Sequence, residues 1–149
     1  MSDLLNISGG PTKPEIIAVS LSKLNLKDGS TFIDIGCVTG AVSIEASKIA
    51  SNLRIYAVDA RAEAIEVAAQ NFEAHGLTDV TLLHGEASSI LSDKTDIGTI
   101  DYVFVGGTKN IRQVLGILCE KNVRRIVVNA VRIETVVRTI GAMQELGIF

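Results

Sequence analysis

The sequence has few of the residues that build disulfide frameworks or metal centres. It contains 2 cysteines, Cys37 and Cys119, and 2 histidines in 149 residues. The cysteines lie far apart and show no metal-ligand spacing, which disfavours both a disulfide scaffold and a zinc site. We therefore expect no bound metal ion.

Long apolar runs and a surplus of basic charge are also missing. No stretch approaches the roughly 18 consecutive apolar residues that a membrane span needs, and the first residues do not read as a signal peptide. The formal net charge of −3 argues against a general nucleic-acid-binding protein, which normally has a basic surplus. These absences predict a cytoplasmic chain with neither a membrane nor a nucleic acid as its partner.

Proline is scarce, and both prolines, Pro11 and Pro14, fall near the start of the chain. They indicate an N-terminal loop over residues 1–14, which a short helix over residues 15–24 follows. No internal repeat, low-complexity tract or linker interrupts the rest. A length of 149 residues is enough for one hydrophobic core, so we expect residues 1–149 to form a single domain.

Short β-branched runs alternate with stretches of helical spacing through the remaining sequence. The runs expected as strands are residues 31–35, 54–58, 80–83, 100–105 and 125–129. The helical stretches are residues 41–50, 62–75, 111–120 and 133–146. This alternation predicts an α/β fold: a Rossmann-like three-layer sandwich around a mainly parallel sheet.

Helical spacing also predicts which side chains face the core in two of these helices. In residues 41–50 it groups Val42, Ala46 and Ile49. In residues 62–75 it groups Ile65, Ala68, Ala69 and Phe72. We expect both groups to pack against the sheet.

A glycine turn follows the first expected strand, and an acid ends the second. Residues 34–40, DIGCVTG, open the next helix, and glycines there let the backbone approach a ligand. Asp59 stands where a carboxylate can accept both ribose hydroxyls of a nucleoside. Ligands of such sheets bind beyond the carboxyl ends of the strands, so the sequence predicts a nucleoside-containing cofactor at this edge.

The glycine spacing separates two classes of cofactor. A dinucleotide turn has the pattern G-x-G-x-x-G, whereas Gly36 and Gly40 form G-x-x-x-G. Asp34, two residues before Gly36, fits the E/D-x-G-x-G-x-G pattern of S-adenosylmethionine-dependent methyltransferases better. Val38 replaces the middle glycine of that pattern. We expect a negative φ at Val38, because a left-handed residue with a side chain costs about 1–2 kcal/mol.

Two further strand ends carry candidate contacts. Glu86, after the third strand, is expected either to accept a hydrogen bond from an adenine amino group or to cap the helix that follows. Gly106 and Gly107 follow the fourth strand. They would leave room for a bulky methyl acceptor, although a tight turn also explains them.

Several segments together resemble the CbiT-type precorrin methyltransferases of cobalamin biosynthesis, a class I S-adenosylmethionine-dependent family. These segments are GPTK from Gly10, DIGCVTG, AVDARAEAIEVAAQNFEAHGL, LLHGEA, DYVFVGGT and VVNAVRIET. The resemblance runs in order from Gly9 to the C-terminus. It implies methylation of a precorrin or cobalt-precorrin macrocycle at C15, with loss of carbon dioxide from the C12 acetate. It also implies a homo-oligomer, because the family tends to form tetramers.

The resemblance and the positions of charge give the candidate site residues. The cofactor, S-adenosyl-L-methionine, would be bound by Thr12, Asp34, Gly36, Cys37, Val38, Thr39, Gly40, Asp59, Ala60, Arg61, Gly85, Glu86, Ala87 and Gly106. A macrocycle rich in carboxylates suits cations, and the substrate candidates are Lys13, Gly107, Thr108, Lys109, Arg112 and Arg132. Asn129 and Glu134 are the catalytic candidates, although Glu134 also suits the start of a helix.

The number of strands raises one further expectation. Methyltransferases of this class usually have seven strands, whereas we count five, so we expect the C-terminal hairpin of strands six and seven to be absent. Residues 125–129 would then form an apolar sheet edge. Three readings would explain such an apolar edge: a truncated chain, a tail outside the given sequence, or cover by another subunit.

Three alternative functions stay open on the sequence alone. The first is a methyltransferase with another acceptor, which could be a small molecule, an RNA or a protein. The second is a non-catalytic module that binds S-adenosylmethionine. The third is a nicotinamide-dependent oxidoreductase, which shares the sheet and the acid but normally has the third glycine.

Overall fold

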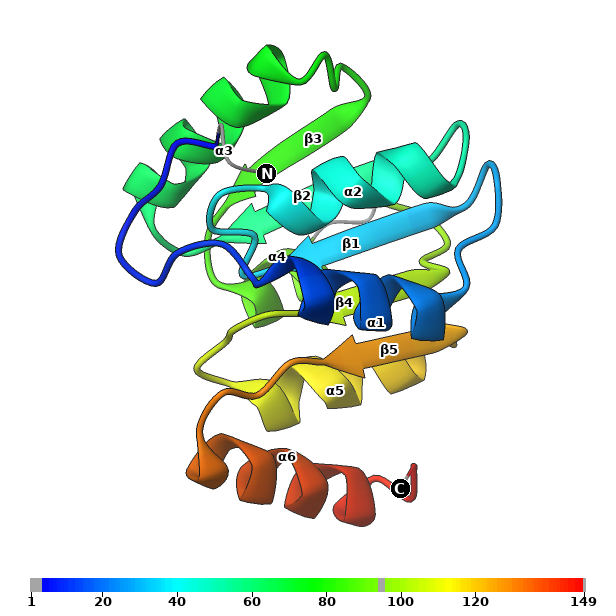
Figure 1. Ribbon diagram of the computed structural model, residues 1–149. Helices are drawn as coiled ribbons and strands as arrows, with labels where there is room; N and C mark the ends of the chain where they lie inside the picture. Colours follow the sequence, from blue (N-terminus) through cyan, green and yellow to red (C-terminus); the bar gives the residue numbers. More distant parts are fainter. Residues whose placement is uncertain (1–3, 94–95, 149) are drawn as a thin grey trace.

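The computed structural model describes residues 4–93 and 96–148. Within these ranges the chain alternates between six helices and five strands (Figure 1). In chain order they are α1 (Pro14–Leu24), β1 (Thr31–Ile35), α2 (Ala41–Ile49), β2 (Arg54–Asp59), α3 (Ala62–Ala74), β3 (Val80–His84), α4 (Ala87–Asp93), β4 (Tyr102–Val105), α5 (Ile111–Glu120), β5 (Arg125–Val128) and α6 (Ile133–Glu145).

The strands form one parallel sheet in the order β3-β2-β1-β4-β5. The chain moves outward from β1 to β3 and then returns to place β4 on the other side of β1. The strand order therefore reverses between β1 and β4, which is where sheets of this kind bind ligands. The predicted parallel α/β fold is confirmed.

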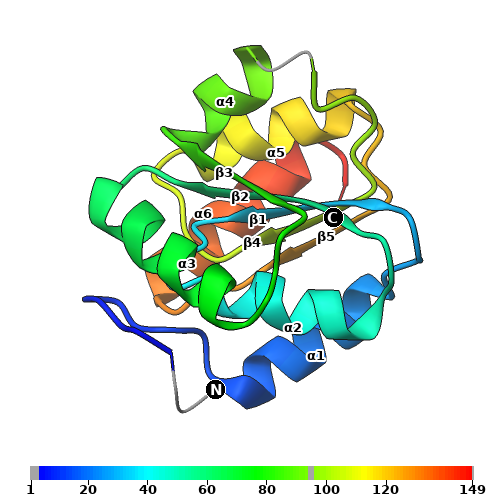
Figure 2. The same ribbon diagram turned by 90° about the horizontal axis from the view of Figure 1, so that it is seen from above.

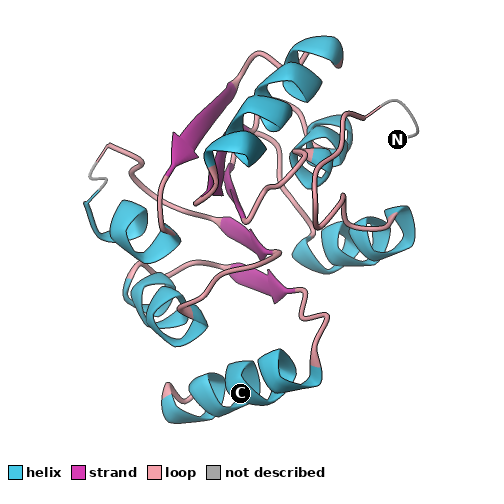
Figure 3. Cartoon of the chain, turned by 90° about the vertical axis from the view of Figure 1, so that its left-hand side faces the viewer, coloured by secondary structure: helices cyan, strands magenta, loops and turns pink. Residues whose placement is uncertain are grey.

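Helices cover both faces of the sheet (Figure 2). On one face, α1, α2 and α3 bury side chains that include Leu21, Val42 and Phe72 against the sheet. On the other face, Leu91 of α4 and Leu115 of α5 pack against β1 and β4, and α6 adds Ala142 to the same cluster. The predicted three-layer sandwich is confirmed, because successive strand residues supply the two cores in turn. Figure 3 shows α6 at the outer end of this second layer, beyond β5.

The predicted core faces of two helices were wrong in part. Ile49 is 59% exposed, because α2 ends at this residue and the extended Ala50 enters the core in its place. In α3, Asn71 is buried, whereas Ala69 is exposed. The face of α3 is rotated so that the amide of Asn71 reaches the N-terminal segment and the glycine turn.

The sequence pattern did not give the bounds of α4, which follows β3 directly. In the part of the chain that the structure describes, no helix has the length and apolar character to cross a bilayer. The same residues contain no group of three or more His, Cys, Asp or Glu side chains arranged to hold a metal ion.

Candidate functional site

The glycine turn after β1 lies directly against the glycine pair after β4. Gly36 has a φ of +72°, and a Cβ there would lie 2.6 Å from the carbonyl oxygen and 2.8 Å from the nitrogen of Gly107. The Gly106 N–H donates to the carbonyl of Ile35 at 2.8 Å. Only glycine satisfies both the positive φ and the close backbone approach at position 36. The structure thus brings the candidate cofactor turn together with Gly106, a cofactor candidate, and Gly107, a substrate candidate.

The rest of the turn is fastened to the end of β2. The N–H groups of Gly36 and Cys37 both donate to the carbonyl of Val58, at 2.8 and 3.0 Å. Gly40 has a φ of +82°, and a Cβ on it would lie 2.7 Å from Cζ of Phe72 in α3. The start of α2 therefore depends on glycine to pack against α3.

Val38 has a φ of +49°, so the negative φ that we expected at this position was wrong. The Val38 N–H donates to Oδ2 of Asp59 at 3.1 Å. The Asp59 carboxylate is only 6% exposed, and a buried charge needs such donors. This hydrogen bond helps to offset the cost of the left-handed valine, about 1–2 kcal/mol.

Asp59 is held in place by its neighbours at the end of β2. Its Oδ1 accepts hydrogen bonds from the backbone N–H of Arg61 at 3.0 Å and from Nε of Arg61 at 3.3 Å. An ionised carboxylate offers about four acceptor positions. Among the described residues, Val38 and Arg61 use three of these positions. One position remains on Oδ2, which is one fewer than the two ribose hydroxyls that we expected Asp59 to accept.

Asp34, two residues before Gly36, is buried and connects β1 to the helix that follows the turn. Its Oδ2 accepts a hydrogen bond from Oγ of Ser43 in α2 at 2.7 Å, and its Oδ1 is buried with no hydrogen-bond partner among the described residues. Burial raises the pKa of Asp34 to about 6, the nearby charge of Asp59 adds to this, and the Ser43 hydrogen bond opposes it. Asp34 links β1 to α2 and stabilises the turn from beneath.

Cys37 packs as a small apolar residue in the turn. It lies with Ile44, Ala57 and Phe72 in one buried cluster. Burial raises the pKa of its thiol well above the usual range, and the charges of Asp34 and Asp59 add to this. A thiol held neutral in this way is a poor nucleophile.

Glu86 caps α4, which was one of its two expected roles. Its Oε2 accepts hydrogen bonds from the N–H groups of Ser88 at 3.0 Å and Ser89 at 3.3 Å, and also from the Ser88 hydroxyl. Burial alone would raise the pKa of Glu86, but the hydrogen bonds from Ser88 and Ser89 outweigh it and the pKa is lowered. The other oxygen, Oε1, is buried and has no partner within the described ranges. The contacts of Glu86 do not test its expected role toward adenine, which stays a prediction.

The end of β3 also joins the site. The N–H of Gly85 donates to the carbonyl of Asp59 at 3.0 Å, and Nε2 of His84 lies 3.0 Å from the carbonyl of Ala60. Ala87, the first residue of α4, is buried, whereas Ala60 is exposed. The predicted residues after β1, β2, β3 and β4 therefore form one continuous edge.

The remaining candidates surround this edge less closely. Lys13, Lys109, Arg132 and Glu134 are exposed, and Thr12, Thr108 and Asn129 are half-buried. The Asn129 N–H donates to the carbonyl of Val105 at 2.9 Å, which places it beside the end of β4. Arg112 forms an exposed ion pair with Glu145 at the end of α6, on the surface of the second helical layer.

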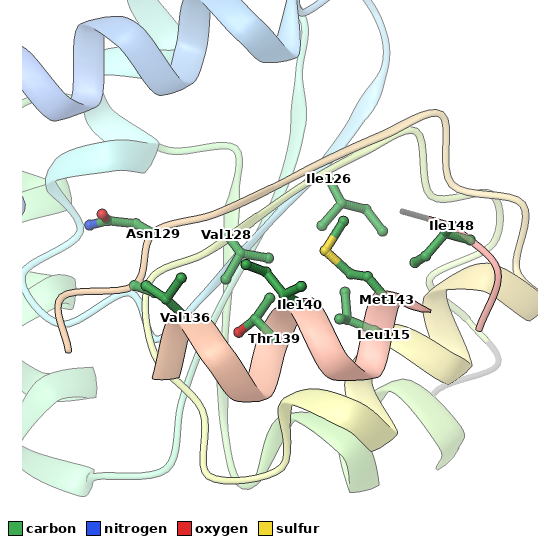
Figure 4. A pocket seen from close by; sticks show the side chains of 10 residues that line it. Leu115, Ile126, Val128, Asn129, Val136, Thr139, Ile140, Met143 and Ile148 are labelled. Carbon is green, nitrogen blue, oxygen red and sulfur yellow. The ribbon is translucent and has the colours of Figure 1, made fainter. Parts of the chain in front are cut away.

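An apolar groove lies between β5 and α6, with a volume of about 420 Å³. Figure 4 shows Ile126 and Val128 of β5 facing Ile140 and Met143 of α6, with Asn129 at one end. Among the predicted site residues, this groove includes Asn129. It is therefore a different feature from the polar edge built around Asp59.

The sequence reasoning missed two buried polar residues that hold the site, Ser43 and Asn71. Asn71 is 1% exposed, and its Nδ2 donates to the carbonyl of Thr39 in the turn at 2.9 Å. The available signal was a polar residue on the same side of a helix as Ala68 and Phe72. A buried amide at such a place must find partners, and the adjacent turn supplies one.

Comparison with known proteins identifies the family. The model of the precorrin methyltransferase domain matches residues 3–148. A relative from Methanosarcina mazei, called a probable cobalt-precorrin-6B C(15)-methyltransferase (decarboxylating), is 62% identical over the whole chain, which covers 81% of that relative.

Two solved structures share the fold over nearly all of the chain. A precorrin-6y C5,15-methyltransferase from Geobacter metallireducens has a TM-score of 0.89 and 29% identity, with 98% of this chain and 78% of that one covered. A precorrin 8W decarboxylase from Methanobacterium thermoautotrophicum has a TM-score of 0.87 and 30% identity, with 98% and 79% covered. Both agree with the resemblance found in the sequence, and the chain belongs to the precorrin methyltransferase domain family.

Proposed function

We propose that this chain is an S-adenosylmethionine-dependent methyltransferase that methylates a precorrin or cobalt-precorrin at C15 and removes carbon dioxide from its C12 acetate. The observation that carries the proposal is the buried Asp59 carboxylate, held at the end of β2 beside a turn that touches Gly107. The acceptor is taken from the names of close relatives, and the cofactor from the family and the geometry.

The residues at the carboxyl edge fit this cofactor. The remaining acceptor position of Asp59 suits a ribose hydroxyl, and the Glu86 carboxylate, two residues after β3, is the candidate acceptor for the amino group of adenine. The glycine turn lets the backbone come close to the methionine end. Bound S-adenosylmethionine supplies a methyl group on a sulfonium centre for in-line transfer to a carbon atom. The protein aligns the two reactants and excludes water, which needs no dedicated nucleophile.

The substrate side offers space and positive charge. A Cβ on Gly107 would meet no atom of the described residues within 4 Å, so a bulky acceptor can approach the turn there. Lys13, Lys109 and Arg132 are exposed cations that suit the carboxylates of a tetrapyrrole. Asn129 and Glu134, on either side of the segment after β5, are the candidates for orienting the acceptor and for proton transfer.

Calorimetric titration with S-adenosylhomocysteine tests the cofactor. Wild-type protein is expected to bind with a micromolar dissociation constant, about −8 kcal/mol, whereas Asp59→Ala loses most of this affinity. Asp79→Ala is a matched control, because Asp79 is exposed and precedes β3, at the amino ends of the strands and away from the candidate site. Binding of NAD in place of S-adenosylhomocysteine would favour the oxidoreductase alternative instead.

Incubation with precorrin substrates and mass spectrometry tests the acceptor. The expected product has gained one methyl group and lost one carbon dioxide. Cofactor binding without turnover of any tetrapyrrole would favour a non-catalytic module. Methylation of a different acceptor would keep the enzyme class and overturn the substrate.

A further inference from the structure

The segment before α1 runs along the outside of α3 and past the glycine turn (Figure 1). We call its described residues, 4–10, the N-terminal strap. Leu4 packs beside the clusters that α1, α2 and α3 form with the sheet. The strap then turns, with the Gly10 N–H donating to the carbonyl of Ile7 at 2.9 Å. It is therefore anchored to the body of the protein rather than free.

One buried amide fastens the strap and the cofactor turn to the same point. Oδ1 of Asn71 accepts a hydrogen bond from the Leu5 N–H at 2.9 Å, and its Nδ2 donates to the Leu5 carbonyl at 3.0 Å. The same Nδ2 donates to the carbonyl of Thr39 at 2.9 Å. Both donors and the acceptor of the amide are thus used, which fixes its orientation. A shift of the strap and a shift of the turn each disturb the same group.

A second contact joins the strap to the acid of the site. Nη1 of Arg61 donates to the carbonyl of Ser8 at 3.1 Å, while Nε of the same guanidinium donates to Asp59. Gly9 has a φ of +98°, and a Cβ on it would make only an ordinary contact with Nη1, at 3.9 Å. The strap is therefore connected independently to the turn through Asn71 and to Asp59 through Arg61.

We propose that Asn71 is a positioning residue that couples the order of the N-terminal strap to the binding of the cofactor. This inference rests on the proposed function, since it concerns the same cofactor edge. With the strap in place, the Thr39 carbonyl is held and the turn loses less conformational freedom on binding. Coupling between two events is reciprocal, so a bound cofactor must also slow the opening of the strap.

The test uses hydrogen exchange together with calorimetry on the whole chain. In the wild type, S-adenosylhomocysteine is expected to slow exchange of the Leu5 amide by roughly tenfold. In Asn71→Leu, that amide is expected to exchange at a rate close to that of unstructured peptide, and the dissociation constant for S-adenosylhomocysteine to rise by a similar factor. The two factors should agree, because they measure one coupling. Gln70→Leu, on the exposed side of α3, is the matched control and should change neither.

The possible outcomes separate this inference from the function on which it rests. An unchanged dissociation constant in folded Asn71→Leu means that Asn71 supports only stability, and the inference falls alone. If this variant does not fold, the exchange measurement on the wild type decides. An exchange rate of the Leu5 amide that is the same with and without S-adenosylhomocysteine overturns the coupling. If the wild type does not bind S-adenosylhomocysteine, the proposed function falls and takes the inference with it.

Discussion

At the scale of single residues, Val38 occupies a left-handed backbone conformation that most side chains avoid. Its φ is +49°, and its side chain is not part of the buried clusters that the described residues form. Replacing Val38 with glycine removes the steric cost, about 1–2 kcal/mol. Glycine also raises the conformational entropy of the unfolded chain, which cancels part of this gain in stability. We expect Val38→Gly to raise the free energy of unfolding by about 1 kcal/mol, measured by urea denaturation.

Val38→Ala provides the control for this prediction. Alanine keeps the cost of a Cβ at positive φ but loses the β-branch, so its stability should fall between those of the other two. A glycine variant that is less stable than the wild type would show that the valine side chain makes a stabilising contact. In that case the turn would owe its shape to packing and not only to hydrogen bonds.

Asp34 gives the fold a distinct pH dependence. Its pKa is raised from 3.8 to about 6 by burial, so the folded chain binds this proton more tightly than the unfolded chain. This tighter proton binding by Asp34 stabilises the folded chain fully below about pH 4, and the stabilisation is lost as the pH rises through 6. The stability of Asp34→Asn relative to the wild type should therefore increase between pH 4 and pH 7, by a few kcal/mol at most.

The measurement is chemical denaturation of both proteins across that pH range. Asparagine keeps an oxygen that accepts from Ser43, so the variant preserves the hydrogen bond in Asp34's place. Asp79→Asn, at an exposed position, should follow the wild-type curve throughout. A constant difference between Asp34→Asn and the wild type would mean that Asp34 has no raised pKa in the folded chain.

At the scale of elements, the close packing of α2 on α3 depends on one glycine. Gly40 has a φ of +82°, and a Cβ added to it would lie only 2.7 Å from Cζ of the Phe72 ring. We expect Gly40→Ala to lower the free energy of unfolding by about 2–4 kcal/mol, because it adds backbone strain to overpacking. Thermal and urea unfolding measure this loss.

Gly116, inside α5, is the opposite case and serves as the control. A Cβ there would lie 4.0 Å from Leu146, an ordinary contact, and the helix gains from alanine. We expect Gly116→Ala to stabilise the protein by about 0.5–1 kcal/mol. Equal effects of the two substitutions would contradict the close contact at Gly40.

The elements also show how far sequence reasoning reaches. The strands were predictable from short β-branched runs, and the glycine turn with Asp59 was predictable because both follow strand ends. The conformation of Val38 was not, since it depends on a hydrogen bond to a residue 21 positions away. The burial of Asn71 was missed for the same reason, because its partners lie in the strap and in the turn.

At the scale of the whole molecule, the described residues at the outer end of the sheet expose several apolar side chains. The segment after β5 and the first turns of α6 expose Val131 (88%), Ile133 (82%) and Val137 (65%). The groove between β5 and α6 adjoins them. We call these three residues with the groove the α6 apolar face. Exposed apolar patches and uncovered strands favour association with another chain.

We expect the protein to self-associate through the α6 apolar face, in agreement with the homo-oligomer that the family resemblance implies. Val137→Lys places a charge on that face and should shift sedimentation toward the monomer, with an unchanged circular dichroism spectrum. Val19→Lys is a matched control, because Val19 is 59% exposed but lies on α1 in the other helical layer. A monomeric wild type, or an equal shift by both variants, would show that the α6 apolar face does not hold the subunits together. A shift confined to Val137→Lys would assign the contact to the end of the sheet, where β5 is the last strand that the described residues form.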